Sequence, residues 1–406
     1  MTVMNFSDLS RLWNDARIRR ITIQVVLVAL VVFCFWWLIS NTSQNLDKLN
    51  KSIGFDFLSQ NAGFQIAPTL GTWLFSYEVG QSTYWDVYLI GIINTLLVAV
   101  LGIIAATVIG FLVGIMRLSN NIIFRSFATV YIELLRNIPL LLQLFFWYFT
   151  VLRSLPDKRG KVDLIPGAVS VNLEGLFLPF PIWHSGAGFA GIILLIAVIS
   201  ALYMRAKSRS RQLMTGHPLA IWRITAGIFA AACLMIVVSV GIPMEWSQPT
   251  FIETGPILKQ GFDKTTAIMI IPEMLAVWFA LTLYTAAFIA ENVRSGILAV
   301  SKGQTEAANA LGLSTGQTLR LIVIPQAMRV IVPPLTSQYL NLTKNSSLAV
   351  AIAYPELVSI FAGTAMNQVG KEIEMFFMMM VVYLTFSLLT SAFMNWFNHR
   401  SKLVER

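Results

Sequence analysis

Long apolar runs are the feature of this sequence that most constrains its fold. A helix needs about 20 apolar residues to cross the hydrocarbon core of a bilayer, and the chain contains several runs of this length. Hydrophobic residues make up 56% of the 406 positions, whereas soluble domains have roughly 45–50%. Because backbone polar groups in lipid must be bonded within their own segment, such runs form helices. The sequence therefore predicts an all-α, polytopic membrane protein.

About eight transmembrane helices are predicted. They cover residues 21–39, 87–116, 127–152, 187–204, 224–242, 273–292, 330–354 and 375–397. The first run follows a basic stretch, as in a signal peptide, but it is long enough to span and no small-residue cleavage site follows at Ser40–Ser43. We therefore expect an uncleaved anchor helix. The polar segments 41–86, 153–186 and 243–272 are expected to be extracytoplasmic loops.

The distribution of basic residues predicts the orientation of these helices. Eighteen Lys and Arg residues fall in the segments assigned to the cytoplasm, and nine fall in the loops assigned to the outside. The basic run at residues 153–161 lies on the outside and weakens this asymmetry. Because cytoplasmic loops carry the excess of Lys and Arg, both termini are predicted to be cytoplasmic.

Residues 301–325, between two apolar runs, predict a capped pair of short helices. Two Ser-x-x-Gln sequences have the spacing of a capping box, Ser301 with Gln304 and Ser314 with Gln317. Gly312 offers the left-handed residue that ends a helix. Neither short helix could span a membrane, so the segment is predicted to be a docking element on the cytoplasmic side.

The same segment carries a recognisable pattern. It reads Glu306-Ala307-Ala308, three residues, Gly312, nine residues, then Ile322-x-Ile324-Pro325. Ala307, Ala308 and Leu311 are expected to share one helical face. The pattern resembles the coupling-helix signature of ABC importer permeases, with Ile324 where Leu is usual.

Three further motifs resemble the polar amino-acid uptake branch of that family. They are Asn94-Thr95-Leu96, Glu133-x-x-Arg136-Asn137-Ile138-Pro139, and Lys344-Asn345-Ser346-Ser347-Leu348. Asn137-Ile138 replaces the commoner Gly-Thr, and Ser301 stands where a proline is frequent. The resemblance covers roughly 87–152 and 273–398, which implies a five-helix permease core.

The resemblance also implies a division of the chain. Residues 1–86 would be an N-terminal anchor and periplasmic segment, and 153–272 an insertion with two extra helices. Residues 87–152 and 273–406 would form the core, with the coupling helix at about 301–325. The size and the insertion resemble the long permease subunit of general L-amino-acid ABC systems.

A member of this family would work in the bacterial inner membrane as the permease subunit of an importer for polar L-amino acids. The family implies a second permease, two ATPase subunits and a periplasmic binding protein, and the unequal size favours a heterodimer of permeases. The sequence contains no G-x-x-x-x-G-K-[ST] phosphate loop. ATP and Mg would therefore be bound by the partner ATPase, and no cofactor is expected in this chain.

Polar residues within the apolar runs are the candidates for a substrate pathway, because burying them in lipid is costly. Gln338, Asn341 and Asn345 recur at one-face helical spacing. The other candidates are Asn94, Glu133, Arg136, Glu291 and Lys344. One alternative is that these residues only join helices, with Glu133–Arg136 and Glu291–Arg294 pairing at i, i+3 spacing. Another is that Arg294 and Lys344 extend to the membrane interfaces by snorkelling.

Two other classes of protein remain as alternatives. An ion-coupled secondary transporter would use Glu133 or Glu291 as its ion site. An intramembrane enzyme would need a catalytic constellation, and none is evident: the three histidines (His184, His217 and His399) lack metal-ligand spacing, and no catalytic or metal site is expected. No nucleic-acid motif is present. The net charge of +9 is expected to act on lipid and loop topology.

Overall fold

The computed structural model of the 406-residue chain describes residues 16–48, 54–216, 220–241, 244–254, 256 and 260–401. Arg11, Lys51, Lys259, Lys402 and Arg406, which entered the charge prediction, lie outside the described residues. The chain divides into two units, Met1–Leu58 and Ser59–Arg406. The first unit consists mainly of one helix, α2 (Ala16–Lys48), whose large apolar side chains are exposed from Ile21 to Ile39.

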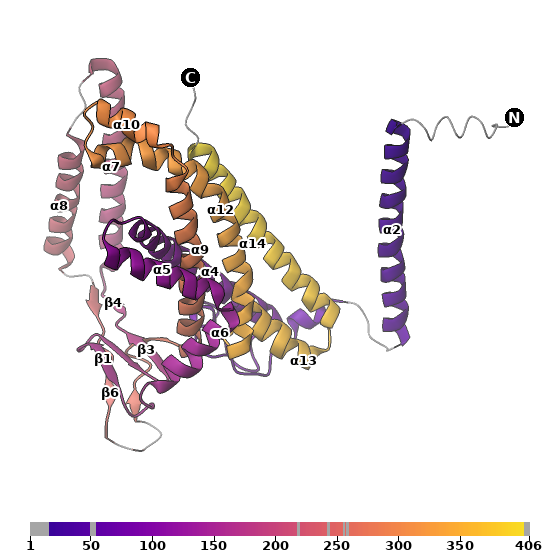
Figure 1. The fold of residues 1–406 in the computed structure, drawn as a ribbon. Coiled ribbons are helices and arrows are strands. Elements are labelled where there is room, and N and C mark those ends of the chain that lie inside the picture. The colour runs from indigo at the N-terminus through magenta and orange to yellow at the C-terminus, as the bar shows by residue number, and fades with distance from the viewer. Residues whose placement is uncertain are drawn as a thin grey trace. The chain divides into compact units, whose positions relative to one another are not determined.

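The second unit contains the remaining helices (Figure 1). They are α3 (Leu70–Leu74), α4 (Tyr84–Arg117), α5 (Ile122–Asn137), α6 (Leu140–Phe145), α7 (Ala187–Thr215), α8 (Ile221–Val240), α9 (Pro272–Leu298), α10 (Lys302–Ala310), α11 (Thr315–Thr318), α12 (Ile324–Asn345), α13 (Met366–Val369) and α14 (Glu372–Ser401). Wider π turns and tighter 3-10 turns extend several of them: η2 (Phe146–Val151), η3 (Leu152–Ser154), η5 (Leu319–Val323), η6 (Ser346–Ile352) and η7 (Val358–Ala365).

Seven of the described helical segments are long and apolar enough to cross a membrane, and a bent pair would make an eighth. The predicted polytopic, mainly helical fold with about eight spans is confirmed. The prediction of one helix over 127–152 is wrong, because α5 and the following segment Leu140–Ser154 meet at an angle of 106°. The break falls at Ile138, which is extended (ψ 128°) in front of Pro139. Proline disfavours helical geometry in the residue before it, which explains the break.

Small residues hold the centre of the bundle together. α4 and α9 run parallel, and Gly110 and Gly114 of α4 lie against Ile289 and Val293 of α9. A Cβ added to Gly110 would lie 2.6 Å from the Cβ of Ile289, so the two backbones approach as closely as glycine allows. Such close approach is the usual way to gain packing energy between helices in lipid.

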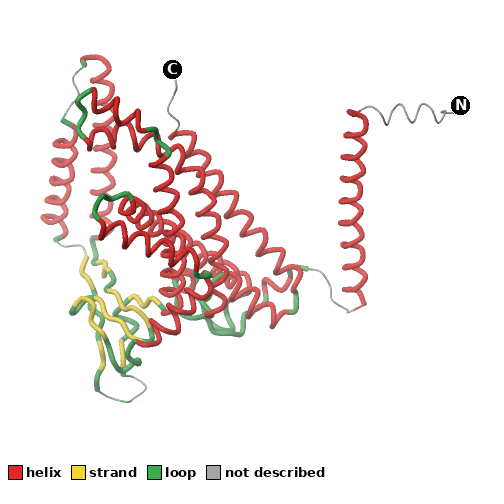
Figure 2. Tube along the Cα trace, in the orientation of Figure 1, coloured by secondary structure: helices red, strands yellow, loops and turns green. Residues whose placement is uncertain are grey.

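The two segments predicted as loops, 153–186 and 243–272, contain short β-strands. β1 (Val162–Ile165), β2 (Val169–Asn172), β3 (Gly175–Leu178) and β8 (Ile268–Ile270) make an antiparallel sheet in the order β1-β2-β3-β8. β4 (Pro181–Trp183) pairs with β5 (Met244–Trp246), and β6 (Phe251–Ile252) pairs with β7 (Gly261–Phe262). The two loops are therefore parts of one small module, which Figure 2 shows in yellow at one end of the bundle.

Helices α7 and α8, the pair predicted to be an insertion and called the inserted pair below, lie between the two halves of this module in the sequence. They pack on each other through Ala190, Ile193 and Ala197 of α7 and Ala232 and Ile236 of α8. α7 extends to Thr215, eleven residues beyond the predicted end. Most of their other apolar side chains are exposed.

The bundle has two distinct ends, which we name by what lies there. The sheet end carries the β-module and the first residues of α4 and α9, and the α10 end carries α10 and the last residues of both helices (Figure 1). α12 runs in the opposite direction, since Tyr339 bonds Thr107 of α4 while Leu342 lies against Gly102.

Candidate coupling elbow and translocation face

The first candidate site is the segment 301–323, which we call the elbow. α10 ends at Ala310, and Gly312 adopts the left-handed conformation (φ 75°). The Gly312 N–H donates to the Asn309 carbonyl at 2.9 Å, and the Leu313 N–H donates to the Ala308 carbonyl at 3.1 Å. The predicted glycine stop is therefore confirmed, and it reverses the chain after a helix of only nine residues.

Only one of the two predicted capping boxes forms. At the start of α11, the Ser314 N–H donates to Gln317 Oε1 at 2.9 Å and the Gln317 N–H donates to Ser314 Oγ at 3.4 Å. At the start of α10, Ser301 is the N-cap residue but its side chain makes no cap bond, so that prediction is wrong. Gln304 instead accepts a hydrogen bond from Gln326 at 3.1 Å, which ties α10 to α12.

Several side chains of the elbow are exposed in the described chain. Of the three residues expected on one face, only Ala308 is buried, whereas Ala307 is exposed and Leu311 is 79% exposed. Glu306 is also exposed and makes no ion pair with the described residues. The elbow therefore leaves an apolar side chain exposed at the C-terminal end of α10, and an acidic side chain exposed within that helix.

Pro325 does not end the second short helix. α11, η5, α12 and η6 are continuous, and together they form a helical segment from Thr315 to Ile352. Pro325 lies in the first turn of α12, directly after the widened π turn of η5, where its missing N–H is accommodated. The elbow is thus one piece with a membrane helix, and a force on it would reach α12 directly.

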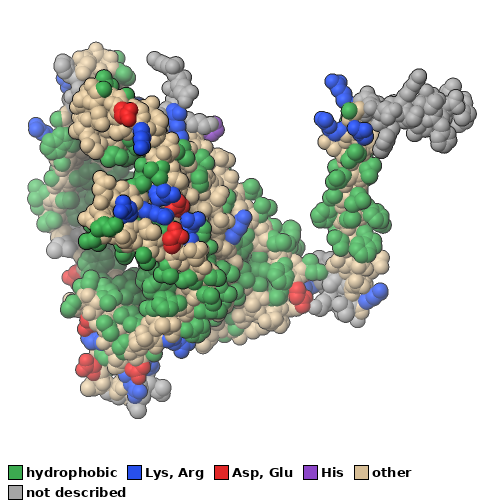
Figure 3. Space-filling view, in the orientation of Figure 1, with side chains coloured by type: hydrophobic (Ala, Val, Ile, Leu, Met, Phe, Trp, Pro, Cys, Tyr) green, Lys and Arg blue, Asp and Glu red, His purple; other side chains and the backbone are tan. Residues whose placement is uncertain are grey.

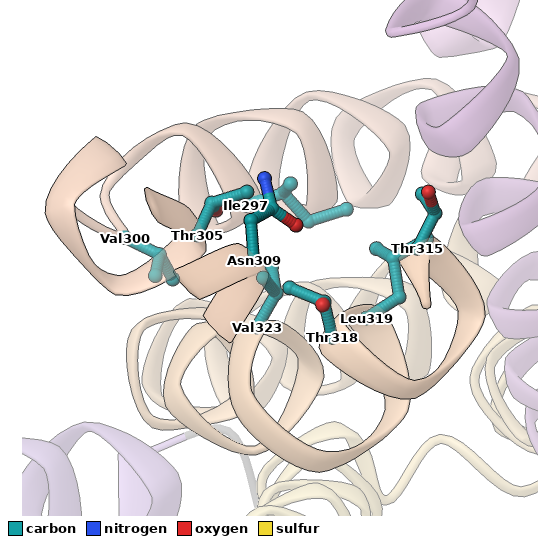
Figure 4. A pocket seen from close by; sticks show the side chains of 8 residues that line it. All are labelled: Ile297, Val300, Thr305, Asn309, Thr315, Thr318, Leu319 and Val323. Atoms are coloured by element: carbon teal, nitrogen blue, oxygen red, sulfur yellow. The ribbon is translucent and has the colours of Figure 1, made fainter. Parts of the chain in front are cut away.

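A cavity of about 350 Å³ lies between α10, α11 and the last turns of α9. Figure 4 shows its lining: Ile297, Val300, Thr305, Asn309, Thr315, Thr318, Leu319 and Val323. Thr318 is 3% exposed, and its hydroxyl has no hydrogen-bond partner among the described residues. α10 therefore meets α9 across a cavity rather than through a filled core.

The predicted pathway residues separate into three groups, of which the first is a charged cluster near the α10 end. Arg117 of α4 contacts Glu133 of α5 at 3.2 Å and also forms an ion pair with Glu291 of α9. Glu291 is bonded in turn by Arg294 at 2.6 Å. The cluster joins three helices, and Figure 3 shows its blue and red side chains gathered over α5.

Arg136 does not pair with Glu133 as the i, i+3 spacing predicted. Its guanidinium lies 5.1 Å from the centre of the Phe288 ring, while Glu133 turns to Arg117. The second predicted pair, Glu291 with Arg294, does form. The spacing was correct for one pair and wrong for the other because the tertiary contact with Arg117 competes with the local one.

Asn94 forms the second group. Its side chain is completely buried, with Oδ1 accepting from the Gly71 N–H at 3.1 Å and Nδ2 donating to the Pro355 carbonyl at 2.7 Å. Both ends of the amide are therefore occupied, and Asn94 ties α3 and the segment after α12 to the sheet-end half of α4.

The third group lies on α12. Gln338 and Asn345 are partly buried, and Asn341 and Lys344 are exposed. None of these four side chains makes a hydrogen bond or ion pair with the described residues. We call this set the α12 polar face. It is the one predicted group whose polar atoms are left available in the described chain.

Sequence reasoning missed the most deeply buried carboxylate of the described residues. Glu356 is 0% exposed and accepts hydrogen bonds from the N–H groups of Val358 at 2.9 Å and Ser359 at 2.8 Å, and from Tyr383 at 3.2 Å. It caps η7, which begins two residues later at Val358. The available signal was a Glu at the start of an apolar stretch. It was overlooked because Glu356 falls between the predicted spans 330–354 and 375–397, in a segment taken as a loop.

The chain belongs to the family of binding-protein-dependent transport system inner membrane components, whose model matches residues 223–403. It is 46% identical over 393 residues to the general L-amino acid transport system permease protein AapQ of Rhizobium johnstonii, covering 97% of this chain and 94% of that protein. It is 44% identical over 385 residues to the amino-acid ABC transporter permease protein YhdX of Escherichia coli, covering 94% of both chains.

Two further similarities extend these matches. The glutamate/glutamine/aspartate/asparagine transport system permease protein BztB of Rhodobacter capsulatus is 38% identical over 429 residues, covering 98% of this chain and 97% of that protein. A solved structure of an amino acid ABC transporter aligns with a TM-score of 0.45 and 18% identity, over 78% of this chain and 95% of that one. The predictions of an ABC importer permease and of the bacterial inner membrane are confirmed.

Proposed function

We propose that this chain is the translocating subunit of an ATP-driven importer for polar L-amino acids of broad specificity. The names of AapQ and BztB, which refer to general L-amino acids and to two acids with their amides, support this substrate class. The α12 polar face, made of amides and one lysine at membrane depth, is the observation in this chain that suits such a substrate. Amides pair well with both the carboxylate and the ammonium of an amino acid.

The elbow is proposed to be the point where an ATPase subunit docks. Its outer surface presents Leu311 and Glu306, and Gly312 sets its reversal. ATP and Mg are bound by that partner, since the sequence has no phosphate loop. When ATP binding closes the ATPase pair, the elbow would carry the movement into α12 and open the pathway in alternating access.

The α10 end is proposed to face the cytoplasm. The last half of α7, which reaches this end, carries four basic residues, Arg205, Lys207, Arg209 and Arg211. Arg117, Lys302 and Arg400 add to the same end. Basic residues favour the cytoplasmic side, so the β-module would face the periplasm, where the amino-acid-binding protein delivers substrate.

A second permease would complete the pathway. Exposed polar side chains on a membrane helix are costly in lipid and are stable when they face a partner or a water-filled cavity. Asn341 and Lys344 of the α12 polar face are exposed in the single chain, which supports pairing across this face. We propose a heterodimer of permeases with two ATPase subunits.

The coupling proposal is tested by Gly312→Val in the complete transporter, with Gly316→Val as the matched control. Neither glycine has an atom within 4 Å of an added Cβ, but only Gly312 has a positive φ. A side chain in this conformation costs about 1–2 kcal/mol, so Gly312→Val should misdirect the elbow and abolish ATP-driven uptake of L-glutamine into proteoliposomes. Glu306→Ala should lower the same rate. Membrane insertion should remain normal in all three variants.

Normal uptake by Gly312→Val would refute the coupling role. Uptake that continues without ATP and collapses with the ion gradient would favour a secondary transporter instead. In the structure, Glu133 and Glu291, the acids such a mechanism would use, are both engaged by Arg117.

A further inference from the structure

Lys344 lies near the middle of the membrane-spanning bundle. Leu342, two residues before it, packs against Gly102, and Tyr339 bonds Thr107 at 2.8 Å. At 1.5 Å per residue, Gly102 is roughly 27 Å along α4 from Tyr84 and roughly 22 Å from Arg117. Lys344 is therefore level with the middle part of α4, far from both ends of that helix.

The ammonium of Lys344 has no partner in the described chain. It is exposed and makes no hydrogen bond or ion pair with the described residues. The charged cluster shows the contrast, since Arg117 and Arg294 both contact Glu291. A cation held at this depth needs an anion, and the described protein does not provide one.

The residues around Lys344 suit a carboxylate. Asn341 lies one turn before it, Asn345 follows it, and Gln338 continues the same face, so amide donors accompany the charge. The face contains no acidic side chain. It therefore has a fixed positive charge for an anion but no negative charge for a cation.

We propose that Lys344 is the carboxylate anchor of the translocation pathway, pairing with the α-carboxylate of each amino acid as it crosses the membrane. The α-carboxylate is common to all L-amino acids, so an anchor for it suits a broad substrate range. Compounds that lack this carboxylate, such as amino-acid amides, are excluded. This inference rests on the proposed import function and adds the group of the substrate that this chain recognises.

Charge-assisted hydrogen bonds explain why the anchor must be basic. An ammonium bonded to a carboxylate gives a short contact about twice as strong as one between neutral groups. Asn and Gln alone would bind a carboxylate and a carboxamide almost equally. Lys344 adds the charge that separates the two, and the neighbouring amides orient the group.

The test compares two probes that differ only at the α-carboxyl: L-glutamine, and L-glutaminamide, in which a carboxamide replaces the carboxylate. Binding is measured on the complete permease–ATPase complex in nanodiscs without the binding protein, so that the membrane site alone discriminates. Lys344→Met should weaken L-glutamine binding by about 30-fold or more, because one partner of a desolvated charge pair is lost. L-glutaminamide binding should change by less than about twofold, and Lys344→Arg should keep the preference for L-glutamine.

Lys264→Met is the control for loss of a positive charge, because Lys264 lies in the β-module, 3.5 Å from Glu174. It should leave both affinities unchanged. An equal loss for both probes in Lys344→Met would overturn the inference and assign Lys344 to a structural pair with a partner's acid. Unchanged binding of both probes, or no L-glutamine binding by the wild-type complex, would also overturn it. Failure of the proposed function is distinct, since it would appear as absent ATP-driven uptake by the wild-type transporter.

Discussion

The central helices and the inserted pair are both apolar enough to span a membrane, yet they are built differently. α7 and α8 are more hydropathic than α9, but 56% of the most apolar window of α9 is buried in the protein, against 11% for α8. Lipid is as apolar as leucine, so a helix that faces lipid can be apolar on all sides. A helix inside the bundle carries small and polar residues, because these allow close packing and hydrogen bonds between helices. Hydropathy therefore identifies a span but not its neighbours.

The glycines show the same difference at single positions. In α4, Gly110 and Gly114 would clash with α9 if they carried a Cβ. In the inserted pair, Gly188, Gly191 and Gly227 have nothing within 4 Å of an added Cβ. In α4, these glycines are needed for close contact with α9. In α7 and α8, a larger side chain would fit at the glycine positions in the described chain.

The largest expected effect comes from Gly110→Val. Its Cβ would lie 2.6 Å from Ile289 Cβ and 3.0 Å from the Ala286 carbonyl, so α4 and α9 would have to separate. Overpacking of this kind costs about 3 kcal/mol. We expect a lower midpoint of thermal unfolding of the purified permease and a lower yield of folded complex.

Gly191→Val provides the comparison in α7. Because it meets open space, it should change the free energy of unfolding by less than about 0.5 kcal/mol. A loss at Gly191 as large as the loss at Gly110 would mean that α7 packs on a protein partner, and the contrast between the two regions would not hold in the assembled transporter.

Buried polar groups give a second, smaller contrast. Asn94→Ala would leave the Gly71 N–H and the Pro355 carbonyl unpaired in the protein interior, which should cost about 2 kcal/mol. Ser239→Ala in α8 removes an exposed hydroxyl that bonds only its own helix at Met235, so it should be nearly neutral. Thermal unfolding of the two variants measures the difference. Equal stability of Asn94→Ala and wild type would leave the Asn94 amide free for the substrate pathway.

The sequence predicted the spans because length and apolarity act locally. Seven of the eight were found within a few residues at most ends, and the glycine stop at Gly312 followed from its own backbone freedom. The bend at Pro139 could have been predicted, because this proline lies within the predicted span 127–152. It was missed because the apolar run continues across it.

The β-module could not be predicted, because its partners are far apart in the sequence. Leu176 of β3 pairs with Ile270 of β8 across two membrane helices, and the strands have only two to four residues each. Short strands bounded by Pro and Gly look like loops until the pairing is known. The same limit applied to the candidate site: spacing could not show that Glu133 would pair with Arg117 rather than Arg136.

The smallest effect is expected from removing the insertion itself. Trp183 of β4 and Met244 of β5 are directly opposite partners in an antiparallel pair, so residues 184–243 leave and re-enter the module at one point. Replacing them with Asn-Gly, which favours the tight turn of a two-residue hairpin, should close this pair without moving α4, α9 or α12. The unfolding midpoint of the shortened permease should match that of wild type, and ATP-driven uptake should persist. Unfolding of the core in this variant would show that α7 and α8 support it in spite of their exposure. A folded core without uptake would instead assign the inserted pair to the contact with a partner subunit.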